Sequence, residues 1–212
     1  MTASLWLVPR ENNPFTKTTI ELITETVPSN FVSLLEGKKV NFEPHVTVTS
    51  DIDASKYGDK PQEWLDSLSL PEFKKEVNDL VLEMDEVEAD DPYFRKLTIK
   101  LLKNDNLIKL AAQCRADAVD SESAQKWAET EYSPHLSLMY ADIPRAEVKK
   151  KVPLIEMQIA YAIGDLFACC GGTLCMGGYL VLVDTSKPVD EWKTIAKRET
   201  PWAMWKMTRN MI

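Results

Sequence analysis

The chain has 212 residues, a net charge of −8 at pH 7 and a hydrophobic fraction of 44%. This length and composition are typical of a globular protein that forms one large domain or two small lobes. The acidity disfavours binding to a long nucleic acid, which depends on many Lys and Arg contacts to phosphates, but it is compatible with a small anionic substrate.

Targeting signals and cysteines indicate the compartment. The N-terminal residues lack the basic and apolar regions of a secretory signal, and no stretch approaches the ~20 apolar residues of a membrane-spanning helix. We therefore expect a soluble, intracellular, cytoplasmic protein, with association with endomembranes such as the Golgi left open. The four cysteines are then expected to be reduced thiols: Cys114, Cys169, Cys170 and Cys175. Their spacing does not match a zinc site, so we expect no metal and no cofactor.

In the first half of the chain, short helices alternate with strands. The apolar, proline and glycine patterns predict a strand at 3–8, a helix from Asn13-Pro14 that Pro28 interrupts, a short helix at 31–35 closed by Gly37, and a strand to about residue 52. They then predict a polar loop at 53–60, a helix at 61–69, and a hairpin of strands at 79–87 and 94–102.

The second half repeats this alternation. The same patterns predict a helix at 107–118, a loop at 119–133 with a helical turn at Trp127, a strand at 135–141, and a helical stretch at 144–168 that Pro153 breaks or kinks. A loop bracketed by Gly171-Gly172 and Gly177-Gly178, a strand at 179–183, and a short strand or turn at 190–197 follow. We expect residues 1–199 to form a single two-lobed domain and residues 200–212 to be a C-terminal extension.

Two stretches that lie 90 residues apart contain the only two histidines of the chain. They are Pro44-His45-Val46-Thr47-Val48-Thr49 and Pro134-His135-Leu136-Ser137-Leu138. Successive side chains of a strand point to opposite faces, so His45, Thr47 and Thr49 should share one face of their strand. By the same argument, His135 and Ser137 should share one face of theirs. The aliphatic residues between them would pack in the core and leave the imidazoles and hydroxyls to a cleft.

These residue types suit acid–base chemistry at phosphorus. Imidazole can accept or donate a proton near neutral pH, and a hydroxyl can donate a hydrogen bond to an anionic oxygen. Two such pairs facing each other would form a symmetric clamp, with one histidine as base and the other as acid, and would need no metal. One His-x-Thr motif alone is more often structural, but its repetition in the same frame favours a shared role. The sequence does not say which histidine is the base.

The paired motifs resemble those of the 2H phosphoesterase superfamily, whose members carry two H-x-[ST]-x motifs on pseudo-symmetric lobes. Within it, the chain is similar to the 2′,3′-cyclic-nucleotide 3′-phosphodiesterases of fungi and plants over roughly residues 4–195. The matching stretches are 4–9, 42–50, 93–97, 126–143 and 189–192. The paired motifs are specific to the superfamily, and the first and last stretches indicate this branch.

The repeated motif also predicts the architecture. We expect an α+β fold with two pseudo-symmetric lobes of mostly antiparallel sheet, with helices on the outside. The strands that contain the two motifs would face a central cleft between two sheets. We expect the protein to be a monomer.

The resemblance implies a metal-independent cyclic phosphodiesterase that acts on a small cyclic phosphate. Its substrates would be nucleoside 2′,3′-cyclic phosphates, opened to 2′-nucleotides, and ADP-ribose 1″,2″-cyclic phosphate, opened to ADP-ribose 1″-phosphate downstream of tRNA splicing. His45 and His135 would be the catalytic pair, while Thr47 and Ser137 would hold the non-bridging oxygens.

Two further residues are candidates for substrate binding. The family uses a tyrosine at the spacing of Tyr140 near the phosphate, although strict alternation puts Tyr140 on the opposite strand face from His135 unless the strand bends or ends there. Trp6, on the first strand, could stack on a base or belong to the core.

Two other functions are left open. The first is an RNA-end enzyme of the 2′-5′ ligase-like branch, which the net acidity and the matches at residues 4–9 and 189–192 disfavour. The second is a non-catalytic nucleotide-binding or scaffold module, which the loss of either histidine would have favoured.

Overall fold

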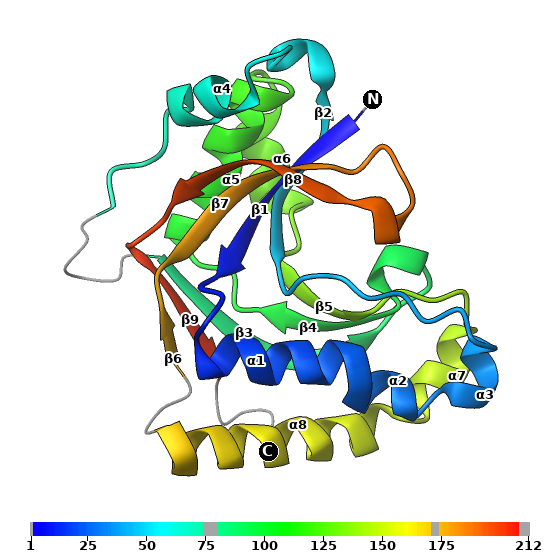
Figure 1. The fold of residues 1–212 in the computed structure, drawn as a ribbon. Coiled ribbons are helices and arrows are strands. Elements are labelled where there is room, and N and C mark those ends of the chain that lie inside the picture. The colour runs from blue at the N-terminus through cyan, green and yellow to red at the C-terminus, as the bar shows by residue number, and fades with distance from the viewer. Residues whose placement is uncertain (1, 74–79, 171–173, 208–212) are drawn as a thin grey trace.

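The computed structural model describes residues 2–73, 80–170 and 174–207. Its strands are β1 (Thr2–Pro9), β2 (Val46–Asp53), β3 (Leu80–Ala89), β4 (Leu97–Leu101), β5 (His135–Met139), β6 (Leu174–Met176), β7 (Gly178–Asp184), β8 (Lys193–Glu199) and β9 (Ala203–Met207). Within the described residues they form one curled nine-stranded sheet in the order β6-β9-β3-β4-β5-β2-β1-β7-β8 (Figure 1). Neighbouring strands are antiparallel except for β3 and β9, which are parallel. The predicted α+β class with a mostly antiparallel sheet is confirmed.

The helices gather at two ends of this sheet. They are α1 (Pro14–Glu21), α2 (Val27–Ser29), α3 (Val32–Leu35), α4 (Pro61–Ser67), α5 (Asp105–Ala118), α6 (Ala124–Thr130), α7 (Arg145–Lys149) and α8 (Val152–Cys170). In Figure 1, α4, α5 and α6 lie together at the top, while α1, α2 and α8 lie at the bottom. Helix α5 packs on β2 and α4 on β8, whereas α1 and α8 pack on each other. Among the described residues, no helix combines the length and the apolar character needed to cross a bilayer.

The two predicted lobes are two halves of one sheet rather than two separate sheets. Strands β2 and β5, which hold the two motifs, are neighbours through the pairing of Val46 with Leu136. This edge-to-edge pairing joins β9-β3-β4-β5 on one side to β2-β1-β7-β8 on the other. Val46, Val48, Leu136 and Leu138 are fully buried, so the aliphatic faces of both motifs pack in the core as predicted.

The first helical region follows its sequence signals with one exception. The side chain of Asn13 accepts a hydrogen bond from the backbone N–H of Phe15 at 2.9 Å, which caps α1. Pro28 was expected to interrupt the helix, but a π-helical stretch at Leu22–Thr26 leads directly into α2, which contains Pro28. The wider π turn accommodates a ring that would otherwise clash with a carbonyl of the preceding turn.

Other segments can be compared with their predicted structure. The strand expected from residue 94 begins at Leu97, because Tyr93–Arg95 form a 3₁₀ turn. The helical turn expected at Trp127 within the loop at 119–133 is α6. The loop expected between the glycine pairs contains β6, and Gly171-Gly172 lies outside the described residues.

The segment expected to be an extension contributes a strand to the sheet. Strand β9 lies between β3 and β6, and the side chain of Trp205 within it is fully buried. Gly178 lies close enough to β1 that a Cβ there would sit 2.3 Å from the carbonyl oxygen of Val8. The glycine therefore permits a close approach of β7 to β1.

Candidate active site

A cavity of about 350 Å³ lies where β1, β2 and β5 meet the Tyr93–Arg95 turn. It brings together five of the six residues predicted from the sequence: Trp6, His45, Thr47, His135 and Tyr140. The sixth, Ser137, does not line it. The cavity therefore contains both imidazoles of the chain.

The two histidines have the same local geometry. Nδ1 of His45 lies 2.6 Å from the carbonyl oxygen of Glu43, and Nδ1 of His135 lies 2.8 Å from that of Ser133. A carbonyl only accepts, so each Nδ1 carries a hydrogen and each neutral ring keeps its lone pair on Nε2. Both carbonyls belong to the residue before the motif proline, and proline restricts that residue to extended conformations. The Pro-His dipeptide thus fixes the tautomer at both sites.

His45 is held neutral by its surroundings. Its side chain is buried against Trp6, with ring centroids 3.7 Å apart and an interplanar angle of 11°. Burial, which disfavours the charged ring, lowers the pKa of His45 to about 4; the hydrogen bond to the Glu43 carbonyl opposes this shift, and the charge of His135 adds to it.

His135 is only partly buried. Burial is the main cause that lowers its pKa, the hydrogen bond to the Ser133 carbonyl opposes the shift, and the positive charge of Arg95 lowers the pKa further. Glu88 and Asp90 act in the opposite direction. Both rings are therefore neutral at pH 7 in the free protein.

Tyr140 reaches the cavity because β5 ends at Met139, so the alternation of strand faces no longer applies. Its hydroxyl oxygen lies 3.3 Å from Nε2 of His45, and it donates to that lone pair. The ring stacks on Phe42 with centroids 4.0 Å apart. Burial raises the pKa of Tyr140, so its hydroxyl keeps its proton near neutral pH.

Thr47 lines the cavity, but Thr49 does not share its face as predicted. Thr49 is buried, and its hydroxyl accepts a hydrogen bond from Nη1 of Arg115 at 3.4 Å. The cause is a β-bulge: Trp6 pairs with Thr47 and Leu5 with Thr49, so β2 has one residue more than β1 at this point.

Ser137 is buried behind the cavity wall. Its hydroxyl donates to the carbonyl oxygen of Phe94 at 3.5 Å, and its side chain also hydrogen-bonds to that of Tyr140. Ser137 thus connects β5 to the Tyr93–Arg95 turn and to Tyr140.

The residues of the cavity wall that were not predicted from the sequence include Phe94, Arg95 and Trp192. The rings of Phe94 and Trp192 stack with centroids 5.7 Å apart, and Trp192 also meets Trp6 edge-on at 5.4 Å. Their only sequence signal was that they lie in stretches that resemble the family, because no periodicity places them in a cleft.

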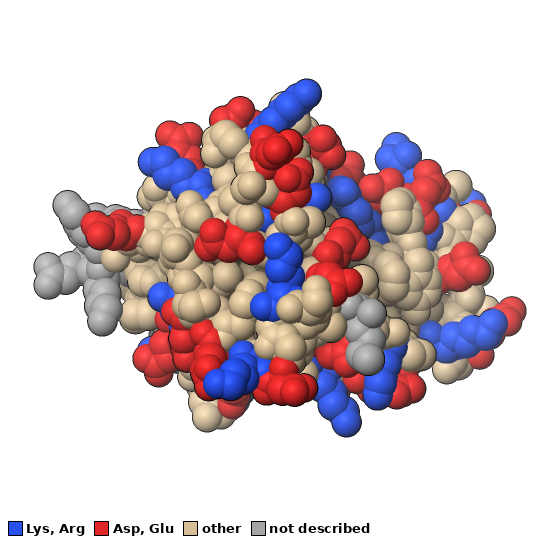
Figure 2. Space-filling view, turned by 90° about the horizontal axis from the view of Figure 1, so that it is seen from above, with Lys and Arg blue, Asp and Glu red and all other residues tan. Residues whose placement is uncertain are grey.

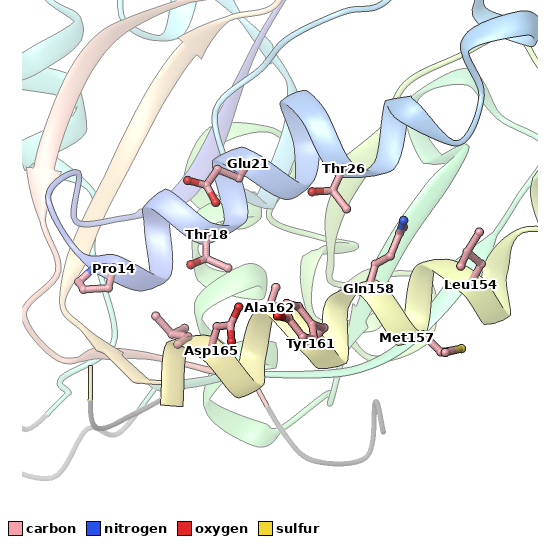
Figure 3. A pocket seen from close by; sticks show the side chains of 11 residues that line it. Pro14, Thr18, Glu21, Thr26, Leu154, Met157, Gln158, Tyr161, Ala162 and Asp165 are labelled. Atoms are coloured by element: carbon pink, nitrogen blue, oxygen red, sulfur yellow. The ribbon is translucent and has the colours of Figure 1, made fainter. Parts of the chain in front are cut away.

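A separate pocket lies between α1 and α8 (Figure 3). It has a volume of about 620 Å³ and is bordered by polar side chains such as Thr18, Glu21, Gln158 and Asp165. Neither histidine borders it, so it lacks the acid–base pair of the smaller cavity.

In the described part of the chain, the side chains that commonly bind metals are dispersed. The described residues contain no group of three or more His, Cys, Asp or Glu side chains that could hold an ion. Cys114 and Cys175 are buried and free, while the side chains of Cys169 and Cys170 lie outside the described part.

Comparisons with known proteins cover nearly the whole chain. A family model described as cyclic phosphodiesterase-like protein matches residues 1–200, which include both histidine motifs. A relative from Phaeosphaeria nodorum, named 2′,3′-cyclic-nucleotide 3′-phosphodiesterase, is 36% identical over 93% of this chain and 98% of its own length. Relatives of the same name from Neurospora crassa and Yarrowia lipolytica are 30% and 25% identical, over 92% and 94% of this chain and 98% and 100% of their own lengths.

Proposed function

The chain belongs to the cyclic phosphodiesterase-like protein family, and we propose that it hydrolyses nucleoside 2′,3′-cyclic phosphates to 2′-nucleotides without a metal. The observation that carries this proposal is the pair of imidazoles in one small cavity, each with Nδ1 bonded to a carbonyl, which leaves the lone pair on Nε2.

The environment of each ring supports a division of roles. His45, whose pKa is about 4, is the base that removes a proton from the attacking water. His135, which is less buried, is the acid that protonates the departing 3′ oxygen once the substrate anion has raised its pKa. The bond from phosphorus to this oxygen breaks as water adds in line, which leaves the phosphate on the 2′ oxygen.

Hydroxyl groups of the cavity would bind the phosphate. Thr47 would donate to a non-bridging oxygen whose charge grows in the transition state. Tyr140 donates to Nε2 of His45, and a bound phosphate would offer its hydroxyl a stronger, charged acceptor. This exchange would open Nε2 of His45 to the attacking water.

The aromatic wall would hold the nucleoside. One face of Trp6 is covered by His45, so Trp6 would meet the substrate through its remaining surface beside Trp192. Aromatic faces stack on all nucleobases, which suits an enzyme with several nucleotide substrates.

The same chemistry supports ADP-ribose 1″,2″-cyclic phosphate as a second substrate, in a step downstream of tRNA splicing. This compound also contains a five-membered cyclic phosphate on a ribose. An adjoining pocket of about 610 Å³ shares Trp6 and Trp192 with the cavity and would give room for the adenosine diphosphate portion.

An RNA-end reaction has less support. Figure 2 shows acidic and basic side chains interspersed over the face seen from above, without a continuous basic stripe on that face. Proteins that bind a long phosphate backbone commonly present such a stripe.

We expect turnover of 2′,3′-cyclic AMP to 2′-AMP to persist in EDTA, because the side chains that line the cavity can supply both proton transfers. Liquid chromatography with 2′-AMP and 3′-AMP standards would identify the product. Loss of activity in EDTA with recovery on adding Mg²⁺ or Zn²⁺ would contradict the mechanism. Preference for RNA ends would support the ligase-like alternative, and binding without turnover would support the non-catalytic one.

A further inference from the structure

Arg95 provides positive charge to the cavity. We infer that its guanidinium binds the phosphate of the substrate beside His135, an inference that rests on the proposed function. Among the described residues that line the cavity, Arg95 is the only one with a permanent positive charge, and Asp51 is the only carboxylate. The substrate phosphate is an anion throughout the working pH range, so Arg95 is its natural charged partner.

The guanidinium of Arg95 has an unpaired donor. Its Nε is buried and has no hydrogen-bond partner in the described part of the chain. The facing carboxylate, Oδ2 of Asp90, lies 3.6 Å from Nε, which is too long for a hydrogen bond but close enough to orient the side chain. A buried donor without a partner is costly, and a planar guanidinium matches the geometry of phosphate oxygens. The arrangement is that of an anion-binding side chain.

Arg95 interacts electrostatically with His135. The charge of Arg95 lowers the pKa of His135, while Glu88 and Asp90 raise it, so these groups interact electrostatically. Arg95 and His135 also line the same cavity of about 350 Å³, so a phosphate bound there beside His135 would lie next to Arg95. Binding of the anion would neutralise the guanidinium charge and let His135 take up its proton.

The hydroxyl of the second motif, that of Ser137, would then contribute to phosphate binding indirectly, through the turn that carries Arg95. Ser137 donates to the carbonyl oxygen of Phe94, the residue before Arg95. Thr47 would contact the phosphate directly on the His45 side, whereas Ser137 would position the turn so that Arg95 contacts it on the His135 side. The two motifs would thus use their hydroxyls differently.

The test replaces Arg95 with methionine, whose side chain is also long and unbranched but has no charge and no hydrogen-bond donors. We expect Arg95→Met to lower kcat/KM for 2′,3′-cyclic AMP by at least ~10²-fold, the scale of losing one donor to developing transition-state charge. Arg95→Lys should recover part of this loss. The matched control is Arg145→Met, because Arg145 binds the carbonyl oxygen of Ala89 near the same hairpin end but does not line the cavity.

Two further readouts separate substrate contact from a structural role. Arg95→Ala should be partly rescued by added guanidinium ion, and Arg95→Met should weaken competitive inhibition by 2′-AMP at least tenfold, with no change for Arg145→Met. The upper limb of the pH profile of kcat/KM should also move to higher pH in Arg95→Met, because a positive neighbour that lowers the pKa of His135 is gone.

Different results would contradict the role of Arg95 and the proposed activity. If the wild type hydrolyses the cyclic nucleotide and folded Arg95→Met retains its kcat/KM and its inhibition by 2′-AMP, Arg95 does not bind the phosphate. A loss of activity that neither lysine nor guanidinium reverses would also overturn the inference. If the wild type shows no turnover, calorimetric binding of 2′-AMP to the wild type and to Arg95→Met still decides the role of Arg95.

Discussion

Replacing either His45 or His135 with alanine should lower kcat for 2′,3′-cyclic AMP by at least ~10²-fold and leave the fold intact. The two rings are the only imidazoles of the chain, and both border the same cavity. Each Nδ1 bonds a carbonyl only two residues earlier, and the long-range hydrogen bond of His45, which Nε2 accepts from the Tyr140 hydroxyl, lies within the cavity. The loss should therefore be catalytic, measured as initial rates at saturating substrate beside thermal unfolding of each variant.

The double variant sharpens this prediction. Because base and acid act in the same displacement, His45→Ala with His135→Ala should be little worse than either single variant. Near-native turnover in either single variant would show that the paired-histidine mechanism is wrong.

Thr47→Ala should cause the next largest loss, about 10²-fold in kcat with a smaller change in KM. Its hydroxyl is expected to bond an oxygen whose charge grows in the transition state, so its removal should affect kcat more than ground-state binding. Thr49→Ala is the matched control, because Thr49 lies on the same strand but is bonded to Arg115 on the core side.

Single-turnover and steady-state rates of the two threonine variants would check this difference. A change confined to KM in Thr47→Ala would assign that hydroxyl to ground-state binding only. Equal losses in Thr47→Ala and Thr49→Ala would show that the strand, and not the position of the hydroxyl in the cavity, matters.

The sequence predicted the central strands well because their signal is local. A proline, a histidine and alternating aliphatic and hydroxyl residues were sufficient to place His45 directly before β2 or at its start and His135 on β5, with buried Val46 and Leu136 beside them. Which residues of these two strands pair depends on contacts between segments far apart in the sequence, and no local pattern specifies them. The joining of both halves into one sheet was therefore not predicted.

The errors at the site arise from irregular backbone. A bulge turns Thr49 toward the core, and no residue preference in Val48-Thr49 marks where an extra residue enters a strand. Tyr140 could be placed only by knowing that β5 stops at Met139.

Residues from connecting turns were hardest to predict. Arg95 ends one short 3₁₀ turn and Trp192 follows another, and Phe94 was expected in a strand. Such side chains enter a cavity because of where the flanking strands pack, and that information resides in the tertiary structure rather than in hydrophobic periodicity.

The dependence of kcat/KM on pH tests the acid–base pair most directly. This quantity reports the free protein, in which the pKa of His45 is about 4 and that of His135 lies below its ordinary value of 6.5. Below the lower limb the base is protonated, and above the upper limb the acid has lost its proton. The account predicts a bell with its maximum below pH 6.5, whose two apparent values belong to the coupled pair. The bell for kcat should lie at higher pH, because the bound phosphate anion raises both values. With chemistry shown to be rate-limiting, a plateau in kcat/KM from pH 5 to 9 in the wild type would contradict the account, even if both histidines proved essential.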